Sequence, residues 1–309
     1  MQVIRGSHNL RPEHRGCVAT IGNFDGVHLG HQAVLGQLAE KADALGLPLA
    51  VVTFEPQPQE YFRPDTAPPR LTRLREKVQA LRRYAVDRLL VLRFDAAFAA
   101  QEPQAFIDGV LVDGLGVRHL VIGDDFRFGR QRAGDFDMLR RAGREHGFEV
   151  VNMHTFSLDA ARVSSTRVRA ALAAGDLNAA EKLLGRPYRM SGRVAHGDKL
   201  GRALGFPTAN IHLHRQATPL RGVFAVELYG VHGEPLSGVA NLGTRPTAGG
   251  LRTLLEVHLF DFDRDIYGAQ VQVEFLHKLR DERRFDSLDA LKAQIALDAQ
   301  QARDFLLAG

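Results

Sequence analysis

The sequence predicts an N-terminal domain built on a doubly wound parallel α/β sheet, followed by a C-terminal antiparallel β-barrel that ends in a helix. Apolar strand-like runs alternate with helical patterns up to about residue 184. Short strands separated by glycine and charged turns follow, and only the last pattern is helical. A chain of 309 residues is long enough for about two domains. We place them at residues 1–185 and 186–309.

The first half opens with an apolar, β-prone strand over Cys17–Ile21 and a helix with an apolar stripe. The stripe consists of Val34, Leu35, Leu38, Ala42 and Leu45. Further strands are predicted at 49–54, 88–92 and 119–122, and further helices at 71–84, 103–111 and 135–146. Buried strands that alternate with helices indicate a parallel sheet, in which ligands bind at the carboxyl ends of the strands.

The second half contains short strands, several of which alternate with a period of two. We predict them within 222–230, 236–243, 253–262 and 269–279. In the third of these, Leu255 and Val257 point to one face, so Glu256 and His258 point to the other. The final helix spans 288–306, and Asp286 or Ser287 can cap its start. Its apolar face comprises Leu288, Leu291, Ile295, Ala299, Ala302 and Leu306. These features predict a compact barrel with a terminal helix.

The composition limits the class of protein. Lysine and arginine number 40 against 36 acidic residues, a balance compatible with nucleic acid and equally with small phosphorylated ligands. A single cysteine, Cys17, excludes an intramolecular disulfide and a cysteine-rich zinc site, and it suits a reducing cytoplasm. No apolar run approaches a membrane span, and the first residues lack the apolar core of a secretion signal. We therefore expect a cytoplasmic protein that makes no use of a membrane.

Between the first strand and the first helix stands the stretch TIGNFDGVHLGHQAVL, in which His28 and His31 lie on either side of Gly30. A loop that leads into a helix N-terminus offers free N–H groups and partial positive charge to an anion. Both imidazoles can face one ligand there and donate hydrogen bonds to phosphate oxygens, also as cations. The alternative is that each histidine caps the turn or packs on the sheet. A zinc site is disfavoured, because no third histidine or cysteine has ligand spacing nearby.

The His28–His31 stretch resembles the H-x-G-H signature of the nucleotidylyltransferase superfamily, and SSTRVRAAL, which begins at Ser164, is similar to its S-S-T-x-x-R segment. The resemblance implies a Rossmann-like fold and a reaction in which a phosphorylated acceptor attacks the α-phosphorus of a nucleotide and pyrophosphate leaves. His28 and His31 would stabilise the charge that develops on the phosphate. The nucleotide- or phosphate-binding residues that it implies are Gly22, Asn23, Phe24, Asp25, Gly30, Ser164, Ser165, Thr166 and Arg169.

The stretch GRVAHGDKLGRALGFPTANI of the second half resembles the glycine-rich loop and P-T-A-N motif of riboflavin kinases. A P-loop is excluded, because Asp198-Lys199-Leu200 stand where Lys-Ser/Thr is required. The resemblance implies nucleotide binding by Gly192, Gly197, Lys199 and Gly201. Thr208 and Asn210 offer hard oxygen ligands that suit Mg²⁺ bound with phosphates, the alternative being a turn with two incidental polar residues. Glu256 would be the base for the 5′-hydroxyl of riboflavin, the alternative being an exposed strand residue.

Both halves in this order resemble the bacterial bifunctional riboflavin kinase/FMN adenylyltransferase family. The resemblance implies phosphorylation of riboflavin to FMN by residues 186–309, and adenylylation of FMN to FAD by residues 1–185. Mg²⁺ would be the cofactor and ATP the co-substrate, with ADP and pyrophosphate as products and no nucleic acid required. The flavin-binding residues that it implies are Phe62, Asp125, Phe128 and Arg280. Phe62 and Phe128 can stack on an isoalloxazine ring or pack in the core, and both readings stay open.

Two details qualify the resemblance. Gln57 stands where many relatives have histidine, so no catalytic role is assigned to it. The arginine-rich turn over 279–285 can close over a ligand or stay solvated. Two other functions also remain: a nucleotidylyltransferase for another phosphate ester with a regulatory barrel, and a non-enzymatic protein that binds flavin or nucleic acid.

Overall fold

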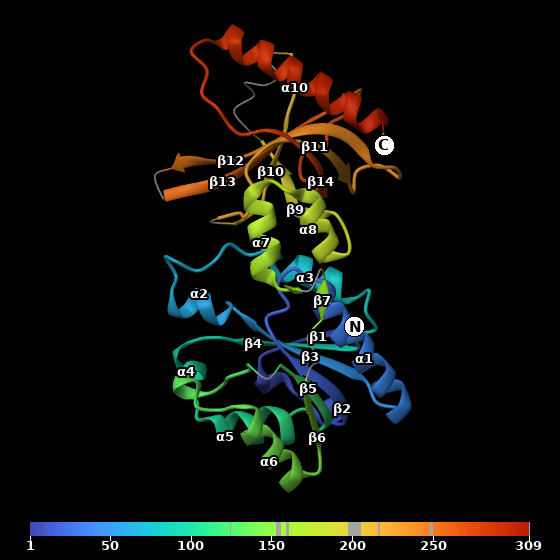
Figure 1. Ribbon diagram of the computed structural model, residues 1–309, viewed down its shortest axis with the longest axis vertical. Coiled ribbons are helices and arrows are strands. Elements are labelled where there is room, and N and C mark those ends of the chain that lie inside the picture. Colours follow the sequence, from blue (N-terminus) through green and yellow to red (C-terminus); the bar gives the residue numbers. More distant parts are fainter. Residues whose placement is uncertain are drawn as a thin grey trace. The chain divides into compact units, whose positions relative to one another are not determined.

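The computed structural model describes residues 1–123, 125–152, 156–158, 161–196, 205–215, 217–247 and 250–308, with the backbone alone at 245–247 and 250–252 (Figure 1). Contacts group the chain into two units. The first comprises residues 1–68 and 73–163, and the second comprises residues 69–72 and 164–309. The helices that follow residue 163 therefore group with the second unit by contacts. The functional boundary at residue 185 stays a prediction.

A six-stranded sheet forms the centre of the first unit, and all its neighbouring strands are parallel (Figure 1). In chain order they are β1 (Gln2–Arg5), β2 (Cys17–Ile21), β3 (Leu49–Glu55), β4 (Arg88–Arg93), β5 (Val117–Ile122) and β6 (Glu149–Asn152). Across the sheet the order is β1-β4-β3-β2-β5-β6. The chain winds outward from β2 in one direction and from β5 in the other, so the topological switch point lies between these two strands. The predicted doubly wound sheet is confirmed.

The helices of this unit mostly follow the predicted pattern. They are α1 (Leu29–Leu45), α2 (Pro58–Phe62), α3 (Leu74–Leu81), α4 (Ala96–Ala99), α5 (Pro103–Phe106) and α6 (Phe136–His146). A π-helical segment (Ile107–Val112) continues α5, 3₁₀ turns occur at Ser7–Asn9, Pro12–His14 and Arg130–Arg132, and β7 (Ser157–Leu158) pairs with β8 (Ala161–Arg162).

Two details of the predicted helices were wrong. The helix predicted over 71–84 spans only α3, because the Glu76 carboxylate accepts a hydrogen bond from the Arg73 N–H (2.6 Å) and thereby caps a start at residue 74. Leu45 was predicted to join the buried stripe of α1 but is 46% exposed. It is the last residue of the helix, where a side chain has helical neighbours on one side only.

Apolar side chains cover both faces of the sheet. Along β2, Cys17, Ala19 and Ile21 belong to one cluster, which also contains Phe106 and Leu139. Val18 belongs to the other cluster, together with the α1 residues Val34, Leu35 and Leu38. Successive strand residues thus point into two separate cores, which is why the strand reads as a continuous apolar run.

The second unit begins with α7 (Ser165–Ala174) and α8 (Leu177–Leu184), and it includes a short segment from early in the chain, residues 69–72, which we call the strap. Three side chains of the unit donate hydrogen bonds to strap carbonyl oxygens: Arg169 Nε to Pro69 (2.7 Å), Arg215 Nη1 to Arg70 (2.6 Å) and Tyr188 Oη to Leu71 (3.1 Å). Leu71 is fully buried. The strap is therefore held along most of its length.

A closed barrel of six strands forms the centre of the second unit (Figure 1). Its strands are β9 (Tyr188–Ala195), β10 (Ala209–His212), β11 (Gly222–Tyr229), β12 (Leu236–Thr247), β13 (Gly250–Leu259) and β14 (Gln270–Arg280). They close in the order β10-β13-β12-β11-β14-β9, and every neighbouring pair is antiparallel. The predicted barrel is confirmed.

The terminal helix α10 (Leu288–Ala308) packs on β11, β12 and β14 through Ala299 and Ala302. The Ser287 hydroxyl accepts a hydrogen bond from the Ala290 N–H (3.1 Å), so Ser287 caps the helix. Leu288, which the sequence places on the apolar face of this helix, is 60% exposed because it lies in the first turn, before the residues that contact the barrel. Among the described residues, none of the helices has the length and apolar character to span a membrane.

Candidate active sites

The loop between β2 and α1, at the switch point of the sheet, has a strained backbone. Phe24 and Val27 have φ values of 47° and 44°, in the left-handed region, which is a genuine outlier for a β-branched residue. Such conformations cost about 1–3 kcal/mol each and concentrate at functional sites. The side-chain amide of Gln32 donates a hydrogen bond to the Val27 carbonyl (2.9 Å) and so fixes the turn from α1.

This loop brings the two predicted histidines side by side. His28 is the N-cap of α1, and its Nδ1 accepts a hydrogen bond from the His31 N–H (3.4 Å). The imidazole rings stack with centroids 3.7 Å apart and an angle of 15° between their planes. A Cβ at Gly30 would lie 3.2 Å from the His28 ring and 3.3 Å from the Val163 carbonyl, so only glycine fits without displacement. The pair is a preformed hydrogen-bonding surface at a helix N-terminus.

Burial determines the charge of His31. Its pKa lies well below the ordinary value of 6.5, first because of burial and then because of the positive charges of His28, Lys77 and Arg162. The sequence allowed a cationic imidazole, whereas the structure holds His31 neutral near pH 7. Within the described part of the chain, the buried His31 Nδ1 has no hydrogen-bond partner. An imidazole with an unused buried nitrogen is suited to a ligand.

The sequence did not identify Lys77 and Arg162 as site residues. Lys77 is fully buried, and its Nζ donates a hydrogen bond to Thr53 Oγ1 (3.2 Å) near the end of β3. Arg162 lies on β8 and forms an ion pair with Asp125 (3.6 Å). One signal for Lys77 existed, since it lies three residues after Leu74 and one before Val78, at helical spacing beside two apolar residues. Together the two residues give the histidine loop a positive surrounding.

Other loop residues predicted to bind nucleotide frame the site. The Gly22 N–H donates to the Val52 carbonyl (3.0 Å), which extends the contact between β2 and β3. The Asn23 carbonyl accepts a hydrogen bond from Thr53 Oγ1 (3.4 Å). Phe24 is 3% exposed, and its ring packs 4.8 Å from that of His31. Asp25 is also buried, with 2% exposed. Contact of these residues with a nucleotide stays a prediction.

The S-S-T-x-x-R segment begins a helix, as expected. Ser164 is the N-cap of α7, and its hydroxyl accepts a hydrogen bond from the Arg167 N–H (3.3 Å). Ser165 and Thr166 form the first turn of α7, where backbone N–H groups suit an anion. Arg169 follows, with its Nε committed to the strap at Pro69. By contacts this segment belongs to the second unit.

Two of the predicted flavin-binding residues differ in exposure. Phe62, at the end of α2, is 61% exposed, and its ring meets those of Tyr61 and Phe94 edge-on. Phe128 is only 7% exposed and packs against Phe106 and Phe126. Phe62 therefore presents a free aromatic surface, whereas Phe128 packs in the core of the described structure. Binding of flavin by either residue stays a prediction.

Gln57, to which the sequence assigned no role, is 6% exposed. Its backbone N–H donates to Glu60 Oε2 (2.8 Å), and its side-chain Nε2 is buried without a hydrogen-bond partner in the described residues. A buried amide nitrogen with no acceptor is costly, so this group is a candidate donor to a ligand.

In the barrel, strand register brings the predicted kinase residues together. Asn210 of β10 lies directly opposite Glu256 of β13, and Glu256 lies directly opposite Asn241 of β12. Directly opposed residues point to the same face, with Cβ atoms about 4.5–5.5 Å apart. Leu255 and Val257, which flank Glu256, are fully buried, so the predicted alternation is confirmed. Asn241 is a member of this polar row that the sequence did not predict.

The row offers oxygen atoms suited to a magnesium ion. Thr208 lies two residues before Asn210, just ahead of β10, at the spacing at which residues of a strand share a face. The side chain of His258 is hydrogen-bonded to the Pro207 carbonyl (2.9 Å), which fixes the chain just before Thr208. Hydroxyl, amide and carboxylate oxygens are the ligands that Mg²⁺ accepts together with phosphates. The residues present therefore fit the predicted cofactor by their chemistry.

A second carboxylate, Glu282, lies beside the row. Its side chain is hydrogen-bonded to Asn241, and burial raises its pKa although Arg221 and Arg280 oppose the shift. A methyl group at Gly243 would overlap the Glu282 carboxylate, so the glycine makes room for it. The turn after β14 is therefore anchored to the barrel by an acidic side chain, which the sequence did not reveal.

Arg280 and Gly192 have structural partners in the barrel. The Arg280 guanidinium donates hydrogen bonds to both Asp298 carboxylate oxygens (2.7 Å from Nη2 to Oδ2), which ties β14 to α10. A Cβ at Gly192 would overlap Ile211 and the His212 carbonyl on β10, so glycine is needed for close strand packing. Their predicted contacts with flavin and nucleotide stay predictions. Gly197, Lys199 and Gly201 lie outside the described residues.

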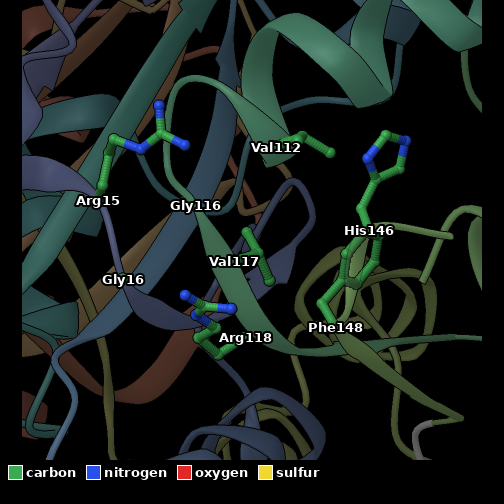
Figure 2. Close-up of a pocket in the computed structure, with 8 residues that line it drawn as sticks. All are labelled: Arg15, Gly16, Val112, Gly116, Val117, Arg118, His146 and Phe148. Carbon is green, nitrogen blue, oxygen red and sulfur yellow. The ribbon is translucent and has the colours of Figure 1, made fainter. Parts of the chain in front are cut away.

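A pocket of about 120 Å³ lies at the other end of the parallel sheet, before β2, β5 and β6 (Figure 2). The residues that line it include Arg15, Arg118 and His146, together with Val117 and Phe148 (Figure 2). Ligands of doubly wound sheets bind at the carboxyl ends of the strands, and this pocket is at the amino ends. It is therefore separate from the histidine loop.

Comparison with known proteins assigns each half of the chain to a family. A model of the FAD synthetase family matches residues 10–167, and a model of the riboflavin kinase family matches residues 184–306. The bifunctional riboflavin kinase/FMN adenylyltransferase of Haemophilus influenzae is 55% identical over 305 residues, which cover 99% of both chains. The protein of the same description from Escherichia coli K12 is 55% identical over 306 residues, covering 99% of this chain and 98% of the relative.

Among solved structures, one from Streptococcus pneumoniae has the same fold. It is described as a macrolide-efflux protein, has a TM-score of 0.83 and 30% identity, and is matched over 98% of this chain and 99% of its own. The similarity extends over both units.

Proposed function

The chain belongs to the family of bifunctional riboflavin kinase/FMN adenylyltransferases, and from this premise we propose where its two reactions take place. The enzyme phosphorylates riboflavin to FMN with ATP and adenylylates FMN to FAD with a second ATP. We assign adenylylation to the histidine loop of the first unit and phosphorylation to the polar row of the barrel. The observation that supports this most directly is that each family model covers one of these sites.

In adenylyl transfer, a phosphate oxygen of FMN attacks the α-phosphorus of ATP, and pyrophosphate leaves. Such chemistry depends on alignment and on neutralised charge more than on a protein nucleophile. We infer that His28 and His31 donate hydrogen bonds to the α-phosphate as its charge develops. Lys77 and Arg162 add positive charge to the same site. By the resemblance of the S-S-T-x-x-R segment, Ser165 and Arg169 at the N-terminus of α7 are proposed to bind phosphate oxygens.

In phosphorylation, the 5′-hydroxyl oxygen of riboflavin attacks the γ-phosphorus of ATP, and ADP leaves. Glu256 is proposed to take the hydroxyl proton, and Thr208 and Asn210 to hold Mg²⁺. When bound, Mg²⁺ would neutralise charge on the phosphates. Asn241, opposite Glu256 in the strand register and hydrogen-bonded to Glu282, is proposed to help orient that carboxylate or the flavin hydroxyl.

A direct assay tests the assignment as a whole. The protein is mixed with riboflavin, Mg²⁺ and ATP, and the flavins are separated over time. FMN should form first and then FAD, without any nucleic acid or membrane. FMN that accumulates without FAD would contradict the proposed adenylylation site.

The single buried cysteine, Cys17, agrees with a cytoplasmic setting for both reactions.

The double substitution Thr208→Val with Asn210→Ala tests the metal site. It removes two oxygen donors, so we expect weaker binding of Mg²⁺ and nucleotide in the barrel and suppressed phosphorylation of riboflavin. Adenylylation of supplied FMN should continue at the normal rate. Both rates are measured by flavin separation across a Mg²⁺ titration. Loss of adenylylation with intact phosphorylation would show that the two reactions are assigned to the wrong units.

A further inference from the structure

Lys77 on α3 is the largest side chain that is fully buried in the described structure. Lysine is almost never fully buried without a partner, because removing an ammonium group from water is costly. A lysine in this position is therefore held by specific contacts, of which the hydrogen bond to Thr53 is one. The proposed reaction gives Lys77 only a general part, as one of two positive charges near the histidine loop.

The contacts of Lys77 lead to the loop after β2. Its Nζ donates to Thr53 Oγ1 (3.2 Å), and that hydroxyl donates to the Asn23 carbonyl (3.4 Å). Because the lysine supplies the proton on one side, the Thr53 hydroxyl is oriented toward Asn23. The ammonium thus determines how the carboxyl end of β3 holds the loop that carries the histidines.

The charge of Lys77 also reaches His31. The charged and titratable groups that act on this imidazole are His28, at the start of the same helix, Lys77 from α3 and Arg162 from β8. Each of them disfavours a proton on His31 in addition to the effect of burial. Lys77 is the fully buried member of this set, so solvent ions screen its charge least.

We propose that Lys77 is a positioning residue for adenylyl transfer, whose buried ammonium organises the His28–His31 pair through Thr53 and through its own charge. The inference rests on the proposal that this transfer takes place at the histidine loop. A neutral His31 keeps one N–H to donate and one nitrogen to accept, so its hydrogen-bonding direction is defined before the substrates bind. A fixed charge beside fixed donors stabilises the developing phosphate charge without reorganisation.

Lys77→Met tests this role because it keeps side-chain length and removes the charge. With one positive neighbour gone, the proton is bound more readily, so the pKa of His31 rises. The acidic limb of kcat/KM for FMN adenylylation should move to higher pH, and the rate at pH 8 should fall at least about tenfold. Lys77→Arg keeps the charge, so its kcat/KM should fall at the same acidic pH as that of the wild type. Thr53→Val removes the hydroxyl that joins Lys77 to Asn23 but keeps the ammonium charge, so it should lower the rate without shifting the pH at which kcat/KM falls.

Two controls make the result decisive. Arg118→Gln, at the far end of the sheet, should leave adenylylation unchanged, and phosphorylation of riboflavin reports whether each variant is folded. If Lys77→Met does not fold, Lys77→Gln, which keeps a donor for Thr53 without the charge, replaces it. A folded, uncharged variant with wild-type rate and pH profile would overturn the inference. If His31→Ala also leaves adenylylation intact, the error lies in the proposed site and not in Lys77 alone.

Discussion

Glu256→Gln is expected to slow phosphorylation of riboflavin by about 10²–10⁴-fold, the usual contribution of a positioned proton acceptor. The substitution preserves the size of the side chain and its place between Asn210 and Asn241, but removes the carboxylate that accepts the proton. The variant should still fold and bind flavin and Mg²⁺–ATP. The rate is measured as FMN formed from riboflavin under saturating ATP, and conversion of supplied FMN to FAD should stay normal.

The matched control for this prediction is Glu234→Gln, the same substitution at an exposed position between β11 and β12. It should change neither activity. A phosphorylation rate near that of the wild type in Glu256→Gln would refute the assignment of Glu256 as base. Transfer to a hydroxyl can depend on alignment more than on a base, so a loss below about tenfold would assign the main task to the neighbouring oxygen donors.

Removal of either imidazole at the histidine loop should produce the second large effect. In His31→Ala, the loss of a donor that stabilises transition-state charge is expected to cost about 3 kcal/mol, or roughly a hundredfold in rate. FAD formation from supplied FMN is measured, while FMN formation from riboflavin should remain intact. His28 also caps α1, so His28→Asn is the sharper change there. Asparagine preserves a cap and removes the imidazole.

The comparison of these variants separates catalysis from folding. His28→Asn should unfold at nearly the wild-type temperature and still lose adenylylation. His28→Ala should lose activity and, in addition, about 1 kcal/mol of stability through the missing cap. Unchanged adenylylation in both His28→Asn and His31→Ala would exclude the histidine pair from the reaction.

In the first unit, the strands that the sequence predicts are those buried on both faces. β2 and β3 are apolar along almost their whole length because each faces two cores, and they occupy the middle of the sheet. The outer strands β1 and β6 have four residues each, and half or more of their side chains reach solvent. Their apolar signal is too short to distinguish from a loop. The order of the strands depends on pairing between distant segments, which local periodicity does not encode.

The residues of the candidate sites divide in the same way, into those that the local sequence identifies and those that only the fold brings together. His28 and His31 are recognisable because their spacing at a strand–helix junction is local. Lys77 and Glu282 are not, because lysine and glutamate are exposed by default, and only the packing of distant segments buries Lys77 and places Glu282 against Asn241. Gly243 is an example. The sequence alone does not explain this glycine, whereas in the structure the Glu282 carboxylate occupies the space that a Cβ at residue 243 would take.

The strap has a consequence for any attempt to divide the chain into separate enzymes. Residues 69–72 lie within the first 163 residues, but their carbonyl groups are bound by Arg169, Arg215 and Tyr188. A kinase fragment that begins after residue 163 loses these acceptors, and each buried donor left unmatched costs about 1–3 kcal/mol. A synthetic peptide that spans the strap should restore part of this loss. Likewise, a chimaera that exchanges one catalytic domain between relatives has to transfer residues 69–72 together with the barrel, since the two domains are not consecutive segments of the chain.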